Sequence, residues 1–599
     1  MGRVTIVAVC SLLYLAPCRA SMDDAAALVQ MTPERHGVED AGDVVGDVKG
    51  RGKKDAQTMK VSSAVRDDKG PLVYTRSGPI RGVYQDESYI FKGIPYAEVP
   101  ERFAVSKIKA PWTKTLQANE WGASCVGARN SRPQAGESED CLKLTIWAPP
   151  TGQKDLPVVV YFHGGQNQRG SAQESTRQGD VITRDRANPI IYVNFDYRLG
   201  IFGWVQGYNL TANLGFRDQQ LALHWIREHI SAFGGNPKKV TLQGHSEGAH
   251  NIVAHMTSPQ SRGLFARAIL HSPPANIWSR KTNVVRTNFI IERSGCAGLR
   301  GDTDDMLKCL REVPLKRLLG NDWSGAALVR NVGERKWSRE IRKLQKFERA
   351  LKLPEETPSF LGWHPVVDGH IIPHEPRMMI RKGDWNKVPV LITMSRNETM
   401  GLIPITNASK MEEVMMPLFA SGEYPQVKRK YMLRLATSGI LVKDELSLVH
   451  QIVTDKMWTC DIRSMANDMV NTGGEVYVEM FAHKPKYDPE GAKINDKCIS
   501  GATCHSAEML YALPQGRGKG IPSQPTFIKE LDFARTYAKG MLSFAYAKPT
   551  EWWARWNTDN HPMTFVTIKG ATVVEDYKED LCRILDSSMG EALPAFYKQ

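Results

Sequence analysis

The pattern of hydrophobic and polar positions after residue 70 predicts an α/β protein. Near-continuous apolar runs at residues 158–162 and 190–193 are typical of strands buried on both faces of a sheet. Leu221, Trp225 and Ile230 recur at helical spacing, which predicts a helix over residues 218–230. Short β-rich runs alternate with helical patterns along the remaining chain. We therefore expect one α/β domain over residues 71–599, with a large, mostly parallel central sheet and helices on both faces.

The first 70 residues follow a different pattern. Arg3, an apolar stretch at residues 4–17 and small residues near position 20 predict a signal peptide over residues 1–20. The apolar stretch is short for a membrane span, and a retained signal anchor is the alternative. Residues 21–70 are polar and charge-rich without sustained periodicity, which predicts a disordered leader. These features indicate a secreted or luminal protein.

The net charge of +13 changes this picture little. Basic residues are scattered and no zinc or RNA-binding motif is present, so we expect no nucleic-acid partner. Residues 335–352 are an exception, with eight basic residues against Glu340 and Glu348. Their apolar residues recur at helical spacing, at Trp337, Ile341, Leu344 and Leu351. This basic amphipathic helix either packs on the body, which we favour, or contacts a membrane surface.

The candidate chemistry begins at residues 240–248. A short β-branched apolar run enters the pentapeptide Gly-His-Ser-Glu-Gly, and a helix-compatible segment follows at residues 249–256. This is the sequence form of a nucleophile elbow, a strand-to-helix turn that projects a serine hydroxyl, here that of Ser246. The flanking glycines avoid the collisions that a Cβ would cause in so tight a turn. The pentapeptide alone is also compatible with an ordinary turn, and spacing does not select the acid and histidine that such a serine needs.

Further motifs resemble the type-B carboxylesterase and cholinesterase family. Ser-Glu-Asp-Cys-Leu at residues 138–142 looks like the second signature of that family. Other matches follow in family order at residues 93–97, 163–165, 197–203, 218–223, 233–237 and 365–369. The resemblance covers most of the chain after Pro71. It implies an α/β-hydrolase fold and hydrolysis of small-molecule carboxylic esters, with no metal or organic cofactor.

The resemblance also implies roles for individual residues. Ser246 matches the nucleophile, Glu398 matches the acid, and His505 matches the base in a segment similar to the family's His-x-x-Glu. Only four histidines follow Glu398 in the chain: His450, His483, His505 and His561. Of these, His505 alone lies in such a segment. Ser272 and Glu508 match positions near this triad and are expected to be hydrogen-bond partners.

The expected oxyanion hole departs from the family pattern. The resemblance places it at four residues: Gly164, Gly165, Gln166 and Glu247. Gln166 and Asn167 stand where the family has Gly-Phe or Gly-Tyr, and a Cβ at residue 166 restricts the loop. His245 and Glu247 flank the serine where the family has Glu and Ala. The Glu247 carboxyl would oppose the developing oxyanion unless its side chain points away or is paired.

Cysteines and sequons fit the secretory route. Cys10 and Cys18 leave with the signal peptide, and the eight that remain favour disulfides in an oxidising compartment. The resemblance implies Cys125–Cys141, Cys296–Cys309 and Cys460–Cys582. We predict a fourth bond, Cys498–Cys504, that braces the histidine loop; the alternative is a buried free thiol at Cys504. Sequons at Asn209 and Asn407 are expected to carry glycans, whereas Asn397 lies in the expected catalytic loop.

The first disulfide loop bears on the substrate. In cholinesterases a tryptophan of this loop binds the quaternary ammonium, but residues 126–140 contain no aromatic residue. His245 also replaces the acid that usually precedes the nucleophile. Both features favour a general carboxylesterase. The alternative is a non-catalytic adhesion or interaction module of the same family; such modules typically lack a triad residue. The sequence indicates neither the natural ester nor the oligomeric state.

Overall fold

The computed structural model describes most of the chain beyond residue 69. The described ranges are 70–127, 136–208, 210–274, 280–299, 302–321, 362–400, 402–403, 405–419, 422–437, 442–485, 502–514, 525–548 and 551–587. All of them fall in one compact unit, residues 61–599. The signal peptide, residues 21–69 of the leader, the basic helix at 335–352 and the sequon at Asn209 lie outside the described residues. Within the described ranges, no helix combines the length and the apolar character that a membrane span requires.

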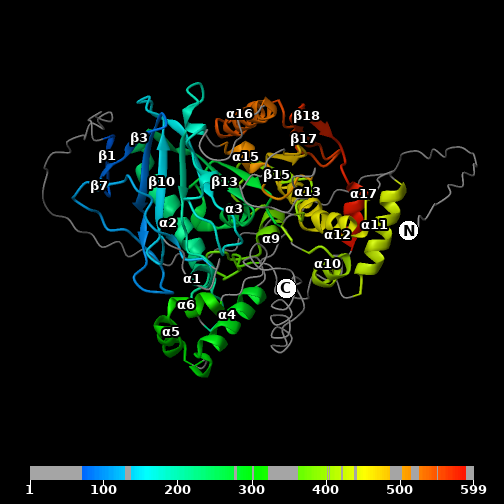
Figure 1. The fold of residues 1–599 in the computed structure, drawn as a ribbon, viewed down its shortest axis with the longest axis horizontal. Coiled ribbons are helices and arrows are strands. Elements are labelled where there is room, and N and C mark those ends of the chain that lie inside the picture. Colours follow the sequence, from blue (N-terminus) through cyan, green and yellow to red (C-terminus); the bar gives the residue numbers. More distant parts are fainter. Residues whose placement is uncertain are drawn as a thin grey trace, which may run out of the picture. The chain divides into compact units, whose positions relative to one another are not determined.

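A sheet of eleven strands forms the centre of this unit (Figure 1). Its spatial order is β18 (Gly570–Val574), β17 (Met563–Thr567), β16 (Val476–Phe481), β15 (Val390–Ser395), β14 (Arg267–His271), β13 (Gly235–His245), β11 (Leu156–Phe162), β12 (Ile191–Phe195), β10 (Lys143–Ala148), β4 (Ser88–Pro95) and β3 (Val83–Gln85). Pairing is parallel from β17 to β12 and antiparallel at both edges. The predicted sheet is therefore confirmed, with antiparallel strands added at its two sides.

Strand β11 shows why the apolar runs are continuous. All seven of its residues are buried. Val158 and Val160 belong to a core cluster on one face of the sheet, and Val159 and Tyr161 belong to a second cluster on the other face. Helices α2 (Leu214–His229) and α3 (Glu247–Thr257) contribute to the first cluster, and α16 (Pro525–Ala545) contributes to the second. Because both faces of the sheet are covered at this strand, apolar side chains follow one another along β11.

The other described elements are short strands and helices around this sheet. The strands are β1 (Leu72–Thr75), β2 (Gly78–Arg81), β5 (Ala97–Glu98), β6 (Lys107–Ile108), β7 (Leu116–Gln117), β8 (Ser124–Cys125) and β9 (Glu137–Ser138). The helices are α1 (Gly200–Trp204), α4 (Arg280–Ser294), α5 (Thr303–Glu312), α6 (Leu315–Asn321), α9 (Pro376–Arg381), α10 (Ala408–Met415), α11 (Tyr424–Thr437), α12 (Glu445–Thr454), α13 (Cys460–Asn471), α15 (Met509–Ala512) and α17 (Glu579–Ser587). The helix predicted over 218–230 lies within α2 and its 3-10 extension, Ile230–Phe233.

Disulfides join several of these elements. The structure contains Cys125–Cys141, Cys296–Cys309 and Cys460–Cys582, which are the three pairs that the resemblance implies. Cys504 is also a disulfide cysteine, but Cys498 lies outside the described residues, so the Cys498–Cys504 pairing stays a prediction.

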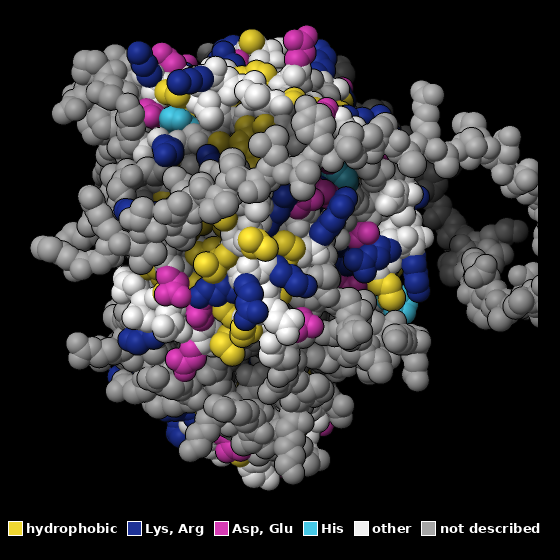
Figure 2. All heavy atoms as spheres, turned by 90° about the vertical axis from the view of Figure 1, so that its right-hand side faces the viewer, with side chains coloured by type: hydrophobic (Ala, Val, Ile, Leu, Met, Phe, Trp, Pro, Cys, Tyr) yellow, Lys and Arg dark blue, Asp and Glu magenta, His cyan; other side chains and the backbone are white. Residues whose placement is uncertain are grey.

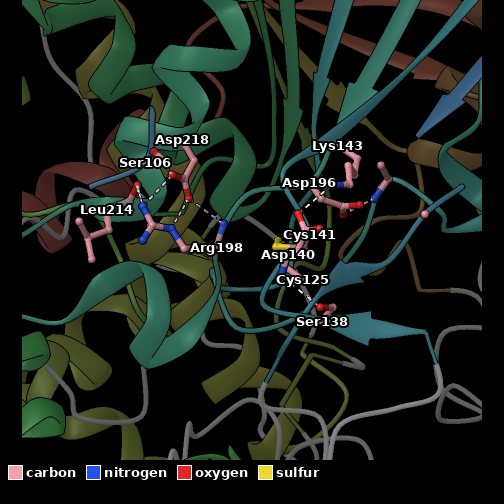
Figure 3. Close-up of a disulfide and its surroundings, with 12 residues drawn as sticks. Ser106, Cys125, Ser138, Asp140, Cys141, Lys143, Asp196, Arg198, Leu214 and Asp218 are labelled. Carbon is pink, nitrogen blue, oxygen red and sulfur yellow. Dashed lines mark hydrogen bonds and ion pairs between the residues drawn. A yellow bond between two sulfur atoms is a disulfide. The ribbon is translucent and has the colours of Figure 1, made fainter. Parts of the chain in front are cut away.

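A buried ion pair lies near the first disulfide (Figure 3). Arg198 follows β12, and its Nε atom donates to Asp218 of α2 across 2.7 Å. Ser106 donates to the same carboxylate across 2.6 Å, and the Asp218 side chain is fully buried. The pair fixes the loop after β12 against α2, and it joins two of the motifs that resemble the family.

Charges of both signs are interspersed on the face drawn in Figure 2. Lys428 of α11 pairs with Glu412 and with Glu445 at 2.5 and 2.7 Å. Arg434 of the same helix pairs with Asp580 of α17. Leu433 of α11 is 66% exposed. The net positive charge is therefore not gathered into one continuous patch among the described residues of this face.

Candidate active site

The turn between β13 and α3 has the geometry of an elbow. Ser246 lies between the two elements with φ 55° and ψ −125°, a conformation that is unfavourable for a residue with a Cβ. A Cβ on Gly248 would lie 2.2 Å from the Phe162 carbonyl oxygen, and one on Gly244 would lie 2.7 Å from the backbone of Gly248. The flanking glycines therefore let α3 pack closely against β11 and hold the serine at the strained position.

Glu398 and His505 meet beyond the ends of the sheet strands. The His505 Nδ1 atom lies 2.5 Å from Glu398 Oε2. The other carboxylate oxygen of Glu398 accepts from the Ser395 N–H at 2.6 Å and from the Ser272 hydroxyl at 2.7 Å. The Glu398 side chain is fully buried, and His505 is 7% exposed. His505 Nε2 is buried without a hydrogen-bond partner among the described residues, so this nitrogen can accept a proton.

His505 contacts the elbow through His245. The two imidazole rings lie 4.7 Å apart between centroids, and His245 directly precedes Ser246. The ring centroids of Trp458 and His505 lie 5.8 Å apart. The His245 Nε2 atom lies 3.1 Å from the hydroxyl of Ser506, next to His505. Because apo hydrogen bonds at such sites often tighten only with substrate, this placement is compatible with proton transfer from Ser246.

The other histidines after Glu398 have different partners. His450 Nδ1 lies 3.0 Å from the Thr399 hydroxyl, His483 pairs with Glu530 at 2.8 Å, and His561 pairs with Asp576 at 2.7 Å. Among the described histidines, His505 is the one that contacts Glu398.

Ser272 connects Glu398 to a second buried carboxyl, that of Glu508. The Ser272 hydroxyl lies 3.1 Å from Glu508, and the Ser395 hydroxyl donates to Glu508 across 2.9 Å. Burial, together with the negative charge of Glu398, raises the pKa of Glu508 to about 7. Glu508 therefore holds a proton below neutral pH, which limits the negative charge around Glu398.

The loop at residues 163–167 lies against the elbow. A Cβ on Gly164 would lie 3.2 Å from the Ser246 Cβ and 2.7 Å from the His245 carbonyl oxygen. Gly165 and Gln166 have positive φ values of 113° and 58°. No hydrogen bond between described residues uses the N–H of Gly165 or of Gln166. The N–H of Glu247, at the start of α3, has no intrahelical acceptor. The loop and the helix therefore provide three N–H donors in the neighbourhood of the serine.

The carboxyl of Glu247 is paired. Its Oε1 atom lies 3.2 Å from Asn167 Nδ2 and 3.0 Å from His250 Nδ1. The sequence marks Asn167 and Glu247 as separate departures, but it does not reveal that they contact each other. His250 was missed as well, although its spacing of three residues from Glu247 on a helix is a signal for such a contact. Trp458 carried no signal in the sequence.

Comparisons with known proteins assign the chain to a family. Residues 69–584 match the model of the Carboxylesterase family. Acetylcholinesterase of Bungarus fasciatus is 28% identical over 450 residues, 69% of each chain. The Crystal protein of Dictyostelium discoideum is 28% identical over 484 residues, 78% of this chain and 79% of the relative. A solved structure of a PNB esterase has a TM-score of 0.66 and 24% identity, covering 86% of this chain and 99% of its own. The chain therefore belongs to the carboxylesterase family, and its α/β-hydrolase fold is confirmed.

Proposed function

We propose that this protein is a serine carboxylesterase that cleaves small carboxylic esters through an acyl-enzyme on Ser246. Family membership supports ester hydrolysis. The observation that carries the mechanism is the buried pair of Glu398 and His505 near the strained Ser246, with no hydrogen-bond partner for His505 Nε2 among the described residues. A serine hydroxyl is a weak nucleophile unless such a base accepts its proton.

The first step forms the acyl-enzyme. The Ser246 oxygen attacks the ester carbonyl carbon while its proton moves to His505 Nε2, and Glu398 stabilises the resulting imidazolium. The oxyanion of the tetrahedral intermediate accepts hydrogen bonds from the N–H groups of Gly165, Gln166 and Glu247. Gly164 supports this geometry because its missing side chain lets the loop approach the serine.

The collapse of this intermediate completes the acyl-enzyme, and a second step then regenerates the enzyme. His505 gives its proton to the leaving alkoxide as the carbonyl re-forms. In the second step the same imidazole accepts a proton from the water that attacks the acyl-enzyme carbonyl. It then returns this proton to the Ser246 oxygen as the acid is released. Ser272 and Glu508 act through Glu398, since their hydrogen bonds fix the carboxylate that orients the histidine.

The surroundings of the serine favour uncharged esters over choline esters, although the Bungarus relative is an acetylcholinesterase. Burial and the proximity of His505 lower the pKa of His245 well below its ordinary value. The residue before the nucleophile is therefore neutral and does not attract a quaternary ammonium. Residues 126–140 also provide no aromatic ring for a cation–π contact.

We also propose that residues 71–599 form one catalytic domain in a secreted or luminal protein. The three disulfides support an oxidising compartment. Asn407 caps α10 with an exposed side chain, which fits a glycan acceptor.

One experiment tests the catalytic proposal. The purified full chain would be incubated with p-nitrophenyl acetate, p-nitrophenyl butyrate, acetylthiocholine and a fluorophosphonate probe, beside a Ser246→Ala variant. We expect turnover and covalent labelling of the wild type only, with lower kcat/KM for acetylthiocholine than for the p-nitrophenyl esters. A folded wild-type protein that is neither labelled nor active would refute the proposal and favour the non-catalytic adhesion module.

A further inference from the structure

Asn167 is fully buried and its side chain reaches α3 (Glu247–Thr257). The Asn167 Nδ2 atom lies 3.2 Å from Glu247 Oε1, 3.3 Å from Asn251 Oδ1 and 3.1 Å from the Trp363 carbonyl oxygen. In return, Asn251 Nδ2 donates to Asn167 Oδ1 across 2.9 Å. Both the donor and the acceptor of this amide are therefore satisfied within the protein. The contacts connect the expected oxyanion loop with the helix that follows the nucleophile.

Glu247 depends on the same contacts. Its side chain is 8% exposed, and its described hydrogen-bond donors are Asn167 and His250. A buried carboxylate is unfavourable unless hydrogen bonds or opposite charges compensate for the lost water. If Asn167 were removed, the carboxylate would lose one of these two donors while remaining next to the serine.

The backbone of the loop is held at the same point. Gln166 and Asn167 have consecutive positive φ values of 58° and 54°. This region is unfavourable for residues with a Cβ, and asparagine tolerates it better than most. The Asn167 carbonyl accepts from the Gly200 N–H across 2.7 Å. The segment at residues 362–363 also packs on the loop, because a Cβ on Gly362 would lie 2.3 Å from the Gln166 Cβ.

We propose that Asn167, Glu247 and His250 form a loop latch that positions the N–H groups of Gly165 and Gln166 for the oxyanion. This inference rests on the proposed function, and it makes Asn167 and the Glu247 side chain positioning residues. It also gives a reason for two departures from the family pattern: a carboxyl beside the developing oxyanion is tolerated because the asparagine of the loop turns it aside. The two side chains should therefore be needed together.

A double-mutant cycle tests this dependence. Four proteins would be compared: wild type, Asn167→Ala, Glu247→Ala and the double variant. The measurements are kcat and KM for p-nitrophenyl butyrate and the Ki of an aryl trifluoromethyl ketone, which mimics the tetrahedral intermediate. We expect Asn167→Ala to lower kcat and to raise the Ki of the ketone, each by about a hundredfold, as for the loss of one oxyanion donor. Glu247→Ala should change both quantities by about tenfold. In the double variant, both should recover to within about tenfold of the wild-type values.

Two further variants separate positioning from stability. Glu247→Gln keeps an oxygen for Asn167 and should retain kcat within about threefold of wild type. Asn213 is the matched control, since it is buried, has φ 57° and donates to Asp368 at 3.0 Å and to the Val366 carbonyl at 2.8 Å. Asn213→Ala should lower the Tm without changing kcat or the ketone Ki.

The outcomes are distinguishable. The latch would be overturned if the losses in kcat of the two single variants multiplied in the double variant. A change in KM with kcat unaltered would overturn it as well. So would an equal loss in Glu247→Gln and Glu247→Ala, and these two variants decide the question if Asn167→Ala does not fold. Failure of the fluorophosphonate to label the wild type would instead overturn the proposed function on which the latch rests.

Discussion

At the scale of single residues, the Glu398 carboxylate has three hydrogen-bond donors in the described part of the chain: His505, Ser272 and the Ser395 N–H. Glu398→Gln would place an amide where His505 Nδ1 now donates, and the imidazole would then favour the tautomer with its proton on Nε2. That tautomer cannot accept the proton of Ser246. We expect kcat for p-nitrophenyl butyrate to fall about ten-thousand-fold, as when the acid of a serine triad is replaced by its amide.

Glu479 provides the control for this change. It is also fully buried, on β16, and it accepts hydrogen bonds from Tyr537 and Trp553 at 2.5 and 2.6 Å. Glu479→Gln should leave kcat unchanged, because this carboxyl touches none of the proposed catalytic groups. A folded Glu398→Gln variant that keeps kcat within tenfold of wild type would exclude the orienting role of Glu398.

The residues of the site differ in how far the sequence could predict them. Ser246, Glu398 and His505 lie in motifs with fixed local order, and the structure brings Glu398 and His505 into contact. The contact between Asn167 and Glu247 joins side chains 80 residues apart. It depends on one rotamer at each position, and no local pattern in the sequence encodes it.

At the scale of elements, the packing of α3 on β11 determines where the serine lies. A Cβ on Gly248 would lie 2.2 Å from the Phe162 carbonyl oxygen, so Gly248→Ala must displace the helix or the strand. We expect this variant to lower the free energy of unfolding by about 3 kcal/mol, the upper range for overpacking. Chemical denaturation measures the change, and fluorophosphonate labelling should slow in parallel.

Gly298 is the matched position for this test. No described residue lies within 4 Å of a Cβ built there, and its φ is not positive. Gly298→Ala should therefore leave both stability and labelling close to wild type. Equal behaviour of the two alanine variants would show that the elbow does not depend on the missing side chain.

The elements themselves were predictable where burial leaves a periodic pattern. The continuous runs of β11 and β12 and the spacing in α2 are of this kind. The π-helical turn Asp455–Thr459, which carries Trp458 to the His505 ring, was not predictable. A change from α to π hydrogen bonding leaves the local composition unaltered, because it arises from packing with neighbouring segments.

At the scale of the whole molecule, buried titratable groups determine how stability varies with pH. Burial raises the pKa of Asp196, Glu479 and Glu508 to about 7. Below pH 7 the folded chain keeps protons on these carboxyls that the unfolded chain has already released. Burial also lowers the pKa of His255 and of His271 to about 3, so these histidines stay neutral while the unfolded chain binds their protons. Between about pH 4 and 6.5, the carboxyls lower the free energy of unfolding as the pH rises, whereas the histidines raise it. From there to neutral pH, only the carboxyls of these two sets contribute.

Asp196→Asn isolates one carboxyl from this balance. The Asp196 carboxylate accepts from the Ala172 N–H at 2.9 Å, and an asparagine oxygen can accept the same bond. In the wild type, the folded state holds one proton more than the unfolded state between the ordinary pKa of 3.8 and about 7. The free energy of unfolding of the wild type should therefore fall relative to that of Asp196→Asn by about 1.4 kcal/mol for each pH unit in this window.

Urea denaturation of both proteins at pH 5, 6, 7, 8 and 8.5 measures this difference, and the histidines cancel because both proteins contain them. We expect the difference to grow from pH 5 to 7 and to stay constant from pH 8 to 8.5, where Asp196 is ionised in both states. A difference that is constant across the whole series would mean that Asp196 ionises near its ordinary pKa. The buried end of β12 would then hold a carboxylate, with a compensating interaction that its hydrogen bond to Ala172 does not provide.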